Sequence, residues 1–202
     1  ASDVYKRQDV DVIVGDWPYG KNESIYENKQ TIQIIVYDQE NNNSVVYDSG
    51  TMRYSNGSDK ELGKIRFNCD TSRYEVEKVD VYYKDSSGKE TLKHTYESVP
   101  EDGISVAFQN GKTNHYYVKA YLKAKLFTVE YDSNGGSGQV PETMNIKAIN
   151  GNKVTVKSTP QPTKEGHIFG GWEYDGTTYF GGESFEMQQK NITFKAKWIE
   201  AS

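Results

Sequence analysis

Short stretches in which apolar and polar residues alternate one by one are the strongest constraint on what this chain can fold into. They recur along the sequence, for example in TIQIIVYDQ (31–39) and YYVKAYL (116–122). A period of two places the apolar side chains on one face of a β-strand. We find no long segment with the 3.6-residue period of an amphipathic helix. The sequence therefore predicts a mainly β fold made of short strands.

The same alternation predicts the core of the first part of the chain. Apolar residues two positions apart on a strand share a face, and a sheet with one wet side buries that face. The residues that we expect to be buried in this way are Val10, Val12, Val14, Ile32, Ile34, Val36, Ile65, Phe67, Val79, Val81, Tyr83, Ile104, Val106, Phe108, Tyr116, Val118, Ala120 and Leu122.

Glycine-containing pairs separate these stretches. They supply the positive φ angles that tight hairpin turns require, and they occur at Asn56–Gly57, Ser87–Gly88, Asp102–Gly103 and Asn110–Gly111. About seven or eight short strands with turns at this frequency are typical of an antiparallel β-sandwich with immunoglobulin-like architecture. The paired core cysteines of antibody domains are missing, so this label describes architecture alone. We assign this domain to residues 9–125.

The character of the sequence changes after residue 125. Ten of the eighteen glycines follow residue 126, and the expected strands become shorter. We expect a second, smaller module over residues 126–199, joined to the first without a linker rich in proline, glycine or serine. Residues 1–8 match no structural element, and we expect them to be a non-native or disordered leader outside the fold.

Composition argues against several classes of partner. The net charge is −5 and no basic tract is present, so we expect neither nucleic acid nor anionic membrane as a partner. No apolar run approaches the roughly 18 residues that span a membrane. Cys69 is the single cysteine and cannot form an internal disulfide.

Residues that commonly carry catalysis or bind metals are scattered. The three histidines, His94, His115 and His167, show no paired metal-ligand spacing. The acidic residues at positions 9, 11 and 16 could form a calcium site, but their spacing matches no EF-hand loop, and a solvent-facing cluster is the favoured interpretation. No nucleophile elbow or phosphate-binding loop is present. We expect no enzymatic activity, no cofactor and no bound metal.

Three segments of the last third of the chain occur in a specific order. They are FTVEYDSNGGSGQVP (127–141), PTKEGHIFGGW (162–172) and GGESFEMQQKNITFKAKW (181–198). Together they resemble the Listeria–Bacteroides repeat, also called the internalin B-repeat, whose pattern has an Asn-Gly-Gly turn, a PTKEGYTFxGW centre and a closing NxTLYAKW. The departures are His167, where tyrosine is usual, and Phe194–Lys195, which replace a Leu-Tyr pair.

The resemblance implies a small β-grasp-like module of bacterial extracellular proteins. Such modules are associated with surface display, spacing and adhesion, and no catalytic activity is implied. The motif residues are then expected to be structural, and they are Phe127, Tyr131, Asn134, Gly135, Gly136, Phe169, Gly170, Gly171, Trp172 and Trp198.

Phe169 and Trp172 raise a question of spacing. Positions three apart on a regular strand point to opposite faces, yet both side chains are large and apolar. Glycine tolerates the backbone angles that a β-bulge needs. We therefore predict a bulge at Gly170–Gly171 that brings both aromatic rings to the core face.

Two functions remain in competition at this point. The favoured hypothesis is a non-catalytic pair of modules from a bacterial cell-surface or secreted protein, acting as a spacer, stalk or adhesion segment. The alternative is a carbohydrate-binding module in which exposed aromatic rings stack on sugars. Its candidate residues are Trp17 with Tyr19, and Tyr82 with Tyr116 and Tyr117. We expect a monomer whose partner is an unidentified protein or glycan.

Overall fold

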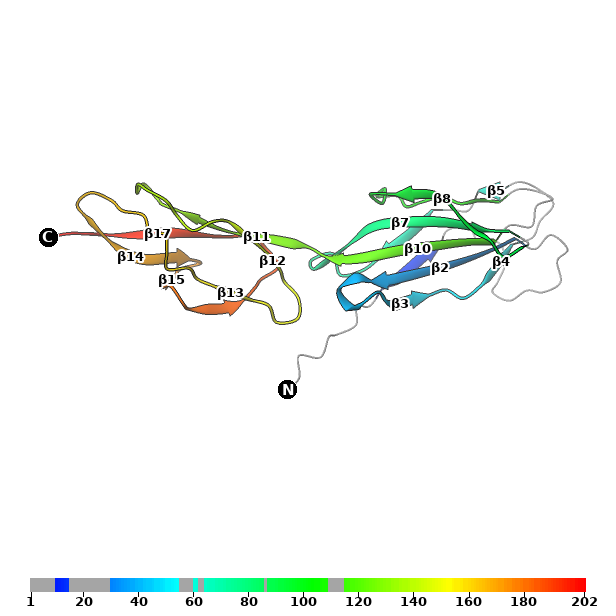
Figure 1. The fold of residues 1–202 in the computed structure, drawn as a ribbon, viewed down its shortest axis with the longest axis horizontal. Coiled ribbons are helices and arrows are strands. Elements are labelled where there is room, and N and C mark those ends of the chain that lie inside the picture. The colour runs from blue at the N-terminus through cyan, green and yellow to red at the C-terminus, as the bar shows by residue number, and fades with distance from the viewer. Residues whose placement is uncertain (1–9, 15–29, 55–59, 62–63, 86, 109–114) are drawn as a thin grey trace. The chain divides into compact units, whose positions relative to one another are not determined.

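A computed structural model describes residues 10–14, 30–54, 60–61, 64–85, 87–108 and 115–202, and strands make up nearly all of its regular structure (Figure 1). The prediction of a mainly β fold is therefore confirmed. The chain divides into two compact units, of which one ends at Lys123 and the other begins at Ala124. Each unit is described by itself below.

The N-terminal unit contains ten strands among the described residues. They are β1 (Asp11–Val14), β2 (Gln30–Asp38), β3 (Ser44–Asp48), β4 (Met52–Tyr54), β5 (Lys60–Glu61), β6 (Ile65–Asn68), β7 (Tyr74–Lys84), β8 (Glu90–Tyr96), β9 (Ala107–Phe108) and β10 (His115–Ala124). The main sheet has the order β3-β2-β10-β7-β8, with β4 also paired to β2, while β1 pairs with β6 and β5 pairs with β9. A short 3-10 helix, η1 (Gln39–Asn41), follows β2.

The main sheet is mixed rather than purely antiparallel. Strand β10 runs parallel to β2, in a register that extends from His115 beside Thr31 to Leu122 beside Asp38. Tight turns join neighbouring strands in antiparallel pairs, and those turns are what the sequence displays. No hairpin connects β2 to β10, so no turn in the sequence indicates whether these two strands run parallel or antiparallel.

Most of the predicted core of the N-terminal unit is present, but Tyr83 is only half-buried and is not part of the buried cluster. Ile32, Ile34 and Val36 on β2 are fully buried, and so are Val118, Ala120 and Leu122 on β10. Val12 and Phe67, from the β1–β6 pair, pack against this cluster, as does Tyr116. The arrangement is thus sandwich-like, with the β1–β6 pair lying against the main sheet. The side chains of Val14 and Phe108 lie outside the described set.

The C-terminal unit consists of seven strands. They are β11 (Leu126–Asp132), β12 (Met144–Lys147), β13 (Lys153–Thr155), β14 (His167–Tyr174), β15 (Thr177–Tyr179), β16 (Ser184–Glu186) and β17 (Ile192–Glu200). Five of them form a sheet with the order β12-β11-β17-β14-β15, and β13 pairs with β16. The central pair, β11 and β17, is parallel, whereas β11–β12, β14–β17 and β14–β15 are antiparallel.

Aromatic rings fill the core of this unit. Trp172 and Phe194 are the two largest fully buried side chains of the described chain. The Tyr131 ring lies between them, with its centroid 4.9 Å from that of Trp172 and 5.2 Å from that of Phe194. Burial of side chains of this size is worth about 1.5–3 kcal/mol each, which matters in a unit this small.

The predicted bulge is present in β14. Phe169 lies opposite Trp198 and Trp172 lies opposite Ala196, so that Gly170 and Gly171 together oppose a single residue of β17. Trp172 is 1% exposed, and Phe169 packs against the same core with its ring centroid 5.1 Å from that of Trp172. Both aromatic rings therefore lie on the core face. The finer labels, immunoglobulin-like and β-grasp-like, stay predictions from the sequence.

The bulge predicts a specific sensitivity at Gly171. Its φ of +106° is one that other residues rarely adopt, and an added Cβ would lie 2.7 Å from Thr178 Cγ2 and 3.0 Å from the Tyr179 carbonyl oxygen. We expect Gly171→Ala to lower the free energy of unfolding by about 3 kcal/mol, since backbone strain and overlap add. Urea unfolding followed by tryptophan fluorescence measures this change.

Gly176→Ala is the matched control. Gly176 also has a positive φ, +76°, but nothing lies within 4 Å of an added Cβ. It should cost about 1 kcal/mol, the price of the backbone conformation alone. Equal losses at the two positions would contradict the close packing that we assign to the bulge.

Asp38 gives a second prediction. Its side chain is fully buried at the end of β2, where Oδ1 accepts a hydrogen bond from the Glu40 backbone N–H and Oδ2 has no hydrogen-bond partner. Burial raises the pKa of this carboxyl, outweighing the hydrogen bond that lowers it. The folded state therefore loses stability as the pH rises from the ordinary carboxyl range, about 4, through the raised pKa.

Asp38→Asn keeps the acceptor for Glu40 and removes the buried charge. We expect the variant to be about 1 kcal/mol more stable than the parent at pH 7, and the difference to shrink at pH 4. Urea unfolding at the two pH values tests this. A variant that is less stable at pH 7 would show that the charge of Asp38 is satisfied in the folded protein.

Candidate binding face and surface pocket

Four tyrosines lie on the outer face of the main sheet, opposite the core of the N-terminal unit. Alternation along each strand places them there, because their immediate neighbours Val36, Val81, Val118 and Leu122 are buried in the core. The four residues are Tyr37 on β2, Tyr82 on β7, and Tyr117 and Tyr121 on β10. We call this set the tyrosine face.

The parallel pairing of β2 and β10 brings two of these rings together. Tyr37 and Tyr121 are register partners, and their rings stack with centroids 5.3 Å apart and planes 20° from parallel. Lysine ammonium groups lie over the rings of the face, as cation–π contacts do. The Nζ–centroid distances are 4.6 Å for Lys119 over Tyr82, 5.2 Å for Lys78 over Tyr121 and 5.8 Å for Lys84 over Tyr117.

Two of these lysines also lie near carboxylates. Lys119 Nζ is 3.9 Å from Glu90 on β8, and Lys78 Nζ is 3.6 Å from Asp80. Asp80 is buried and accepts a 2.7 Å hydrogen bond from the Thr95 hydroxyl. Positive and negative groups are therefore interleaved, and the face carries no concentrated charge of one sign.

The phenols of Tyr37 and Tyr121 stay protonated at neutral pH. Burial raises the pKa of Tyr37, and nearby Asp48 raises it further. Burial also raises the pKa of Tyr121, with Asp80 adding to the effect. Neutral phenols can donate and accept hydrogen bonds but are poor bases at this pH. At neutral pH, Tyr37 and Tyr121 can therefore make hydrogen bonds and ring contacts but are poor proton acceptors.

The structure separates the aromatic residues that the sequence analysis proposed for sugar binding. Tyr82 and Tyr117 share the outer face. Tyr116 does not, because consecutive residues of a strand point to opposite sides, and its ring packs against the core with a centroid 6.1 Å from that of Tyr83. Trp17 and Tyr19 lie outside the described residues.

Tyr37 and Tyr121 were missed by the sequence analysis. Each occupies the outward position of a stretch whose inward residues were correctly predicted to be buried, so the alternation could have placed both on an outer face. Nothing in the sequence indicated that β2 and β10 are neighbours, and that pairing creates the stacked pair.

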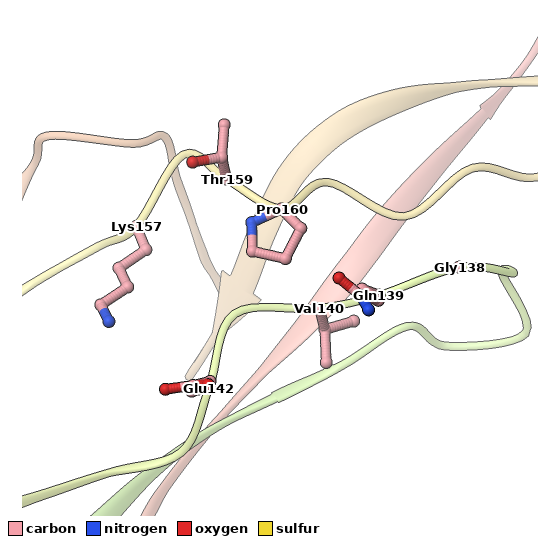
Figure 2. Close-up of a pocket in the computed structure, with 7 residues that line it drawn as sticks. All are labelled: Gly138, Gln139, Val140, Glu142, Lys157, Thr159 and Pro160. Atoms are coloured by element: carbon pink, nitrogen blue, oxygen red, sulfur yellow. The ribbon is translucent and has the colours of Figure 1, made fainter.

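A shallow pocket of about 570 Å³ lies on the C-terminal unit, between the segments 138–142 and 157–160. Figure 2 shows Lys157 and Glu142 at one end and Gln139 and Gly138 at the other. Val140, Thr159 and Pro160 complete the lining, and the Thr159–Pro160 peptide bond is cis. The lining thus holds one ammonium group and one carboxylate, without a histidine or cysteine.

Histidines form no common site in the part of the chain that the structure describes. His94 lies on β8 with its ring edge-on to Tyr96, at a centroid distance of 4.3 Å. His115 Nδ1 lies 2.6 Å from Thr31 Oγ1, and His167 Nδ1 lies 2.8 Å from the Glu165 carbonyl oxygen. Over the described ranges, no three histidine, cysteine, aspartate or glutamate side chains gather as metal ligands. The suggested calcium ligands Asp9 and Asp16 fall outside those ranges.

The Asn-Gly-Gly turn and the last tryptophan form one structural feature. Asn134 and Gly135 have positive φ angles, 49° and 85°, and the Gly136 N–H donates to the Ser133 carbonyl at 3.0 Å, as in a tight hairpin-type turn. The Trp198 ring lies where a side chain at position 136 would be, so only glycine fits there. The indole N–H of Trp198 points to the turn and lies 2.9 Å from the Ser133 carbonyl oxygen.

Part of the chain matches the model of a known family. Residues 127–197, about a third of the chain, match the family model of the Listeria-Bacteroides repeat domain. The match begins with the second residue of β11 and does not extend into the N-terminal unit. No curated protein and no solved structure matches the chain. The C-terminal unit is thus similar to a repeat module of bacterial surface proteins.

The described residues include no helix long and apolar enough to cross a membrane.

Proposed function

We propose that this chain is a non-catalytic, extracellular pair of modules from a bacterial surface protein, in which it serves as a spacer or an adhesion segment. The family match of residues 127–197 supports the location, since repeats of this family are associated with bacterial surface proteins. The function of the N-terminal unit rests on its structure alone.

One observation carries the proposal. Each unit has a core of its own, aliphatic in the N-terminal unit and aromatic in the C-terminal unit. Only Lys125 separates the end of β10 from the start of β11. Units that bury their own apolar surface can fold as separate domains, and so short a connection leaves little chain between them. Both features suit a segment whose task is to hold other parts of a protein at a distance.

The chemistry of the described residues supports a role without catalysis. Glycoside hydrolysis needs two carboxylates across a cleft, and the surface pocket has only Glu142. The proposal therefore places function in contact surfaces.

Carbohydrate binding remains the second candidate, because Tyr82 and Tyr117 share the outer face of the main sheet. Sugars stack on open ring faces, however, and here Lys119 and Lys84 lie over these two rings. Tyr37 and Tyr121 stack on each other. A sugar would have to displace the lysines or break the stacked pair, so we rank this candidate below the spacer or adhesion role.

The module proposal predicts that the C-terminal unit folds alone. Residues 124–202, expressed without the N-terminal unit, should unfold in one cooperative transition at the same urea concentration as they do in the full chain. Fluorescence of Trp172 and Trp198 reports the transition. A fragment that is unfolded, or that has a clearly lower midpoint, would mean that the two units form one cooperative structure.

The sugar-binding alternative has its own test. A glycan array probed with the full chain should show no saturable binding if the ring faces stay covered. Saturable binding that is lost in Tyr82→Ala/Tyr117→Ala, and kept in Tyr116→Phe on the core side, would establish the alternative and overturn our ranking.

A further inference from the structure

The first and last strands of the C-terminal unit lie side by side and run in the same direction. Figure 1 shows β11 and β17 as neighbours in the sheet, and their register pairs Val129 with Ile192 through Asp132 with Lys195. Because the pair is parallel, the start of β11 and the end of β17 lie at opposite ends of it. The chain therefore enters the unit at one end of this strand pair and leaves it at the other.

This geometry decides how the unit meets tension. A pull along the chain draws β11 and β17 past each other along their length. The backbone hydrogen bonds between parallel strands are evenly spaced along the pair, and such a pull stretches all of them together. A pull that separates the strands from one end would instead break the same bonds one after another.

Side-chain bonds extend the connection beyond the paired residues. On one side of the ladder, the Thr128 backbone N–H donates to Asn191 Oδ1 at 2.9 Å. On the other, Asn134 Nδ2 donates to the Ala196 carbonyl at 3.0 Å. The indole N–H of Trp198 adds contacts to the carbonyl oxygens of Ser133 and Asn134, at 2.9 and 3.1 Å. The first strand with its turn is thus bonded to the last strand from residue 128 to residue 134.

The core beneath the pair also opposes sliding. Tyr131 and Phe194 are register partners, their ring centroids are 5.2 Å apart, and both side chains are buried. The Tyr131 hydroxyl accepts a 2.9 Å hydrogen bond from the Lys157 backbone N–H on a third segment. Movement of β11 along β17 would pull these rings out of register and open the core.

We propose that β11 and β17, with Asn191, Asn134 and Trp198, form a clamp that lets the C-terminal unit resist tension along the chain. We call this set the β11–β17 clamp. In it the Asn-Gly-Gly turn and Trp198 have a mechanical role, because their hydrogen bonds hold the two strands together. The biological use of the clamp rests on the proposed spacer function, whereas its resistance follows from strand direction and bonding alone.

Single-molecule force spectroscopy on the full chain tests the clamp. In a Cys69→Ser background, which removes the only cysteine, paired cysteine handles at Leu126 and Glu200 load the clamp along its length. Handles at Leu126 and Lys190 load the same two strands from one end. The side chains at all three handle positions are exposed. We expect the unfolding force to be about twofold or more higher with the first pair, because the bonds then break together.

Two asparagine variants make a matched comparison within the first geometry. Asn191→Ala removes the side-chain acceptor of Thr128 and should lower the unfolding force. Asn145→Ala changes an exposed asparagine of β12 that lies opposite Thr128 on its other side, and should leave the force unchanged.

Equal forces in the two geometries, or equal effects of the two asparagine variants, would overturn the clamp. Failure of the clamp proposal can be told apart from failure of the module proposal, because different experiments test them. If residues 124–202 do not fold alone, the module proposal fails, while the force comparison, made in the full chain, still decides whether the clamp exists.

Discussion

The C-terminal unit depends on one interaction, the parallel pairing of its first and last strands over a buried aromatic core. Val129, Tyr131, Ile192 and Phe194 face inward from these two strands and are buried. The two neighbouring strands, β12 and β14, attach to the outer sides of this central pair. Local hairpins alone would not close such a unit, because its two central strands are separated by nearly its whole length. The bonds of Asn191, Asn134 and Trp198 across that pair then explain why these residue types stand at the two ends of the repeat pattern.

The N-terminal unit uses a related solution with different side chains. Its long strands β2 and β10 are also parallel and adjacent, and their inward residues are aliphatic and fully buried. Their outward residues include the stacked pair Tyr37 and Tyr121, and lysines lie over Tyr121 and over the further rings of Tyr82 and Tyr117. The outer face is thus half-buried by its own side chains. Such a face can make a broad polar contact with a partner, whereas it offers few open ring faces for a sugar.

Much of this structure could be predicted from local sequence patterns. The rest could not, because it depends on contacts between segments that are far apart in the chain. The buried positions Ile32, Ile34 and Val36 follow from alternation. The bulge at Gly170–Gly171 follows from two large apolar residues at a spacing that a regular strand does not allow. The stacking of Tyr37 on Tyr121 required the pairing of β2 with β10, two strands far apart in sequence that no turn connects. Asp38 follows Ile32, Ile34 and Val36 on the inward face of β2, so its burial could be predicted from alternation. That one of its oxygens has no hydrogen-bond partner depends on how distant segments pack around it. Which distant strands pair with each other cannot be predicted from local patterns in a single sequence.

In a spacer that resists tension, the two strands that bear the force should be the last part of the unit to open. Amide hydrogen exchange on the full chain, read residue by residue by NMR, tests this claim most directly, because it measures the free energy of local opening. Our account predicts that the hydrogen-bonded amides between Val129 and Asp132, and between Ile192 and Lys195, exchange more slowly than all other amides of the C-terminal unit. Faster exchange in these segments than in the edge strands β12 and β15 would show that the central pair is not what holds the unit together.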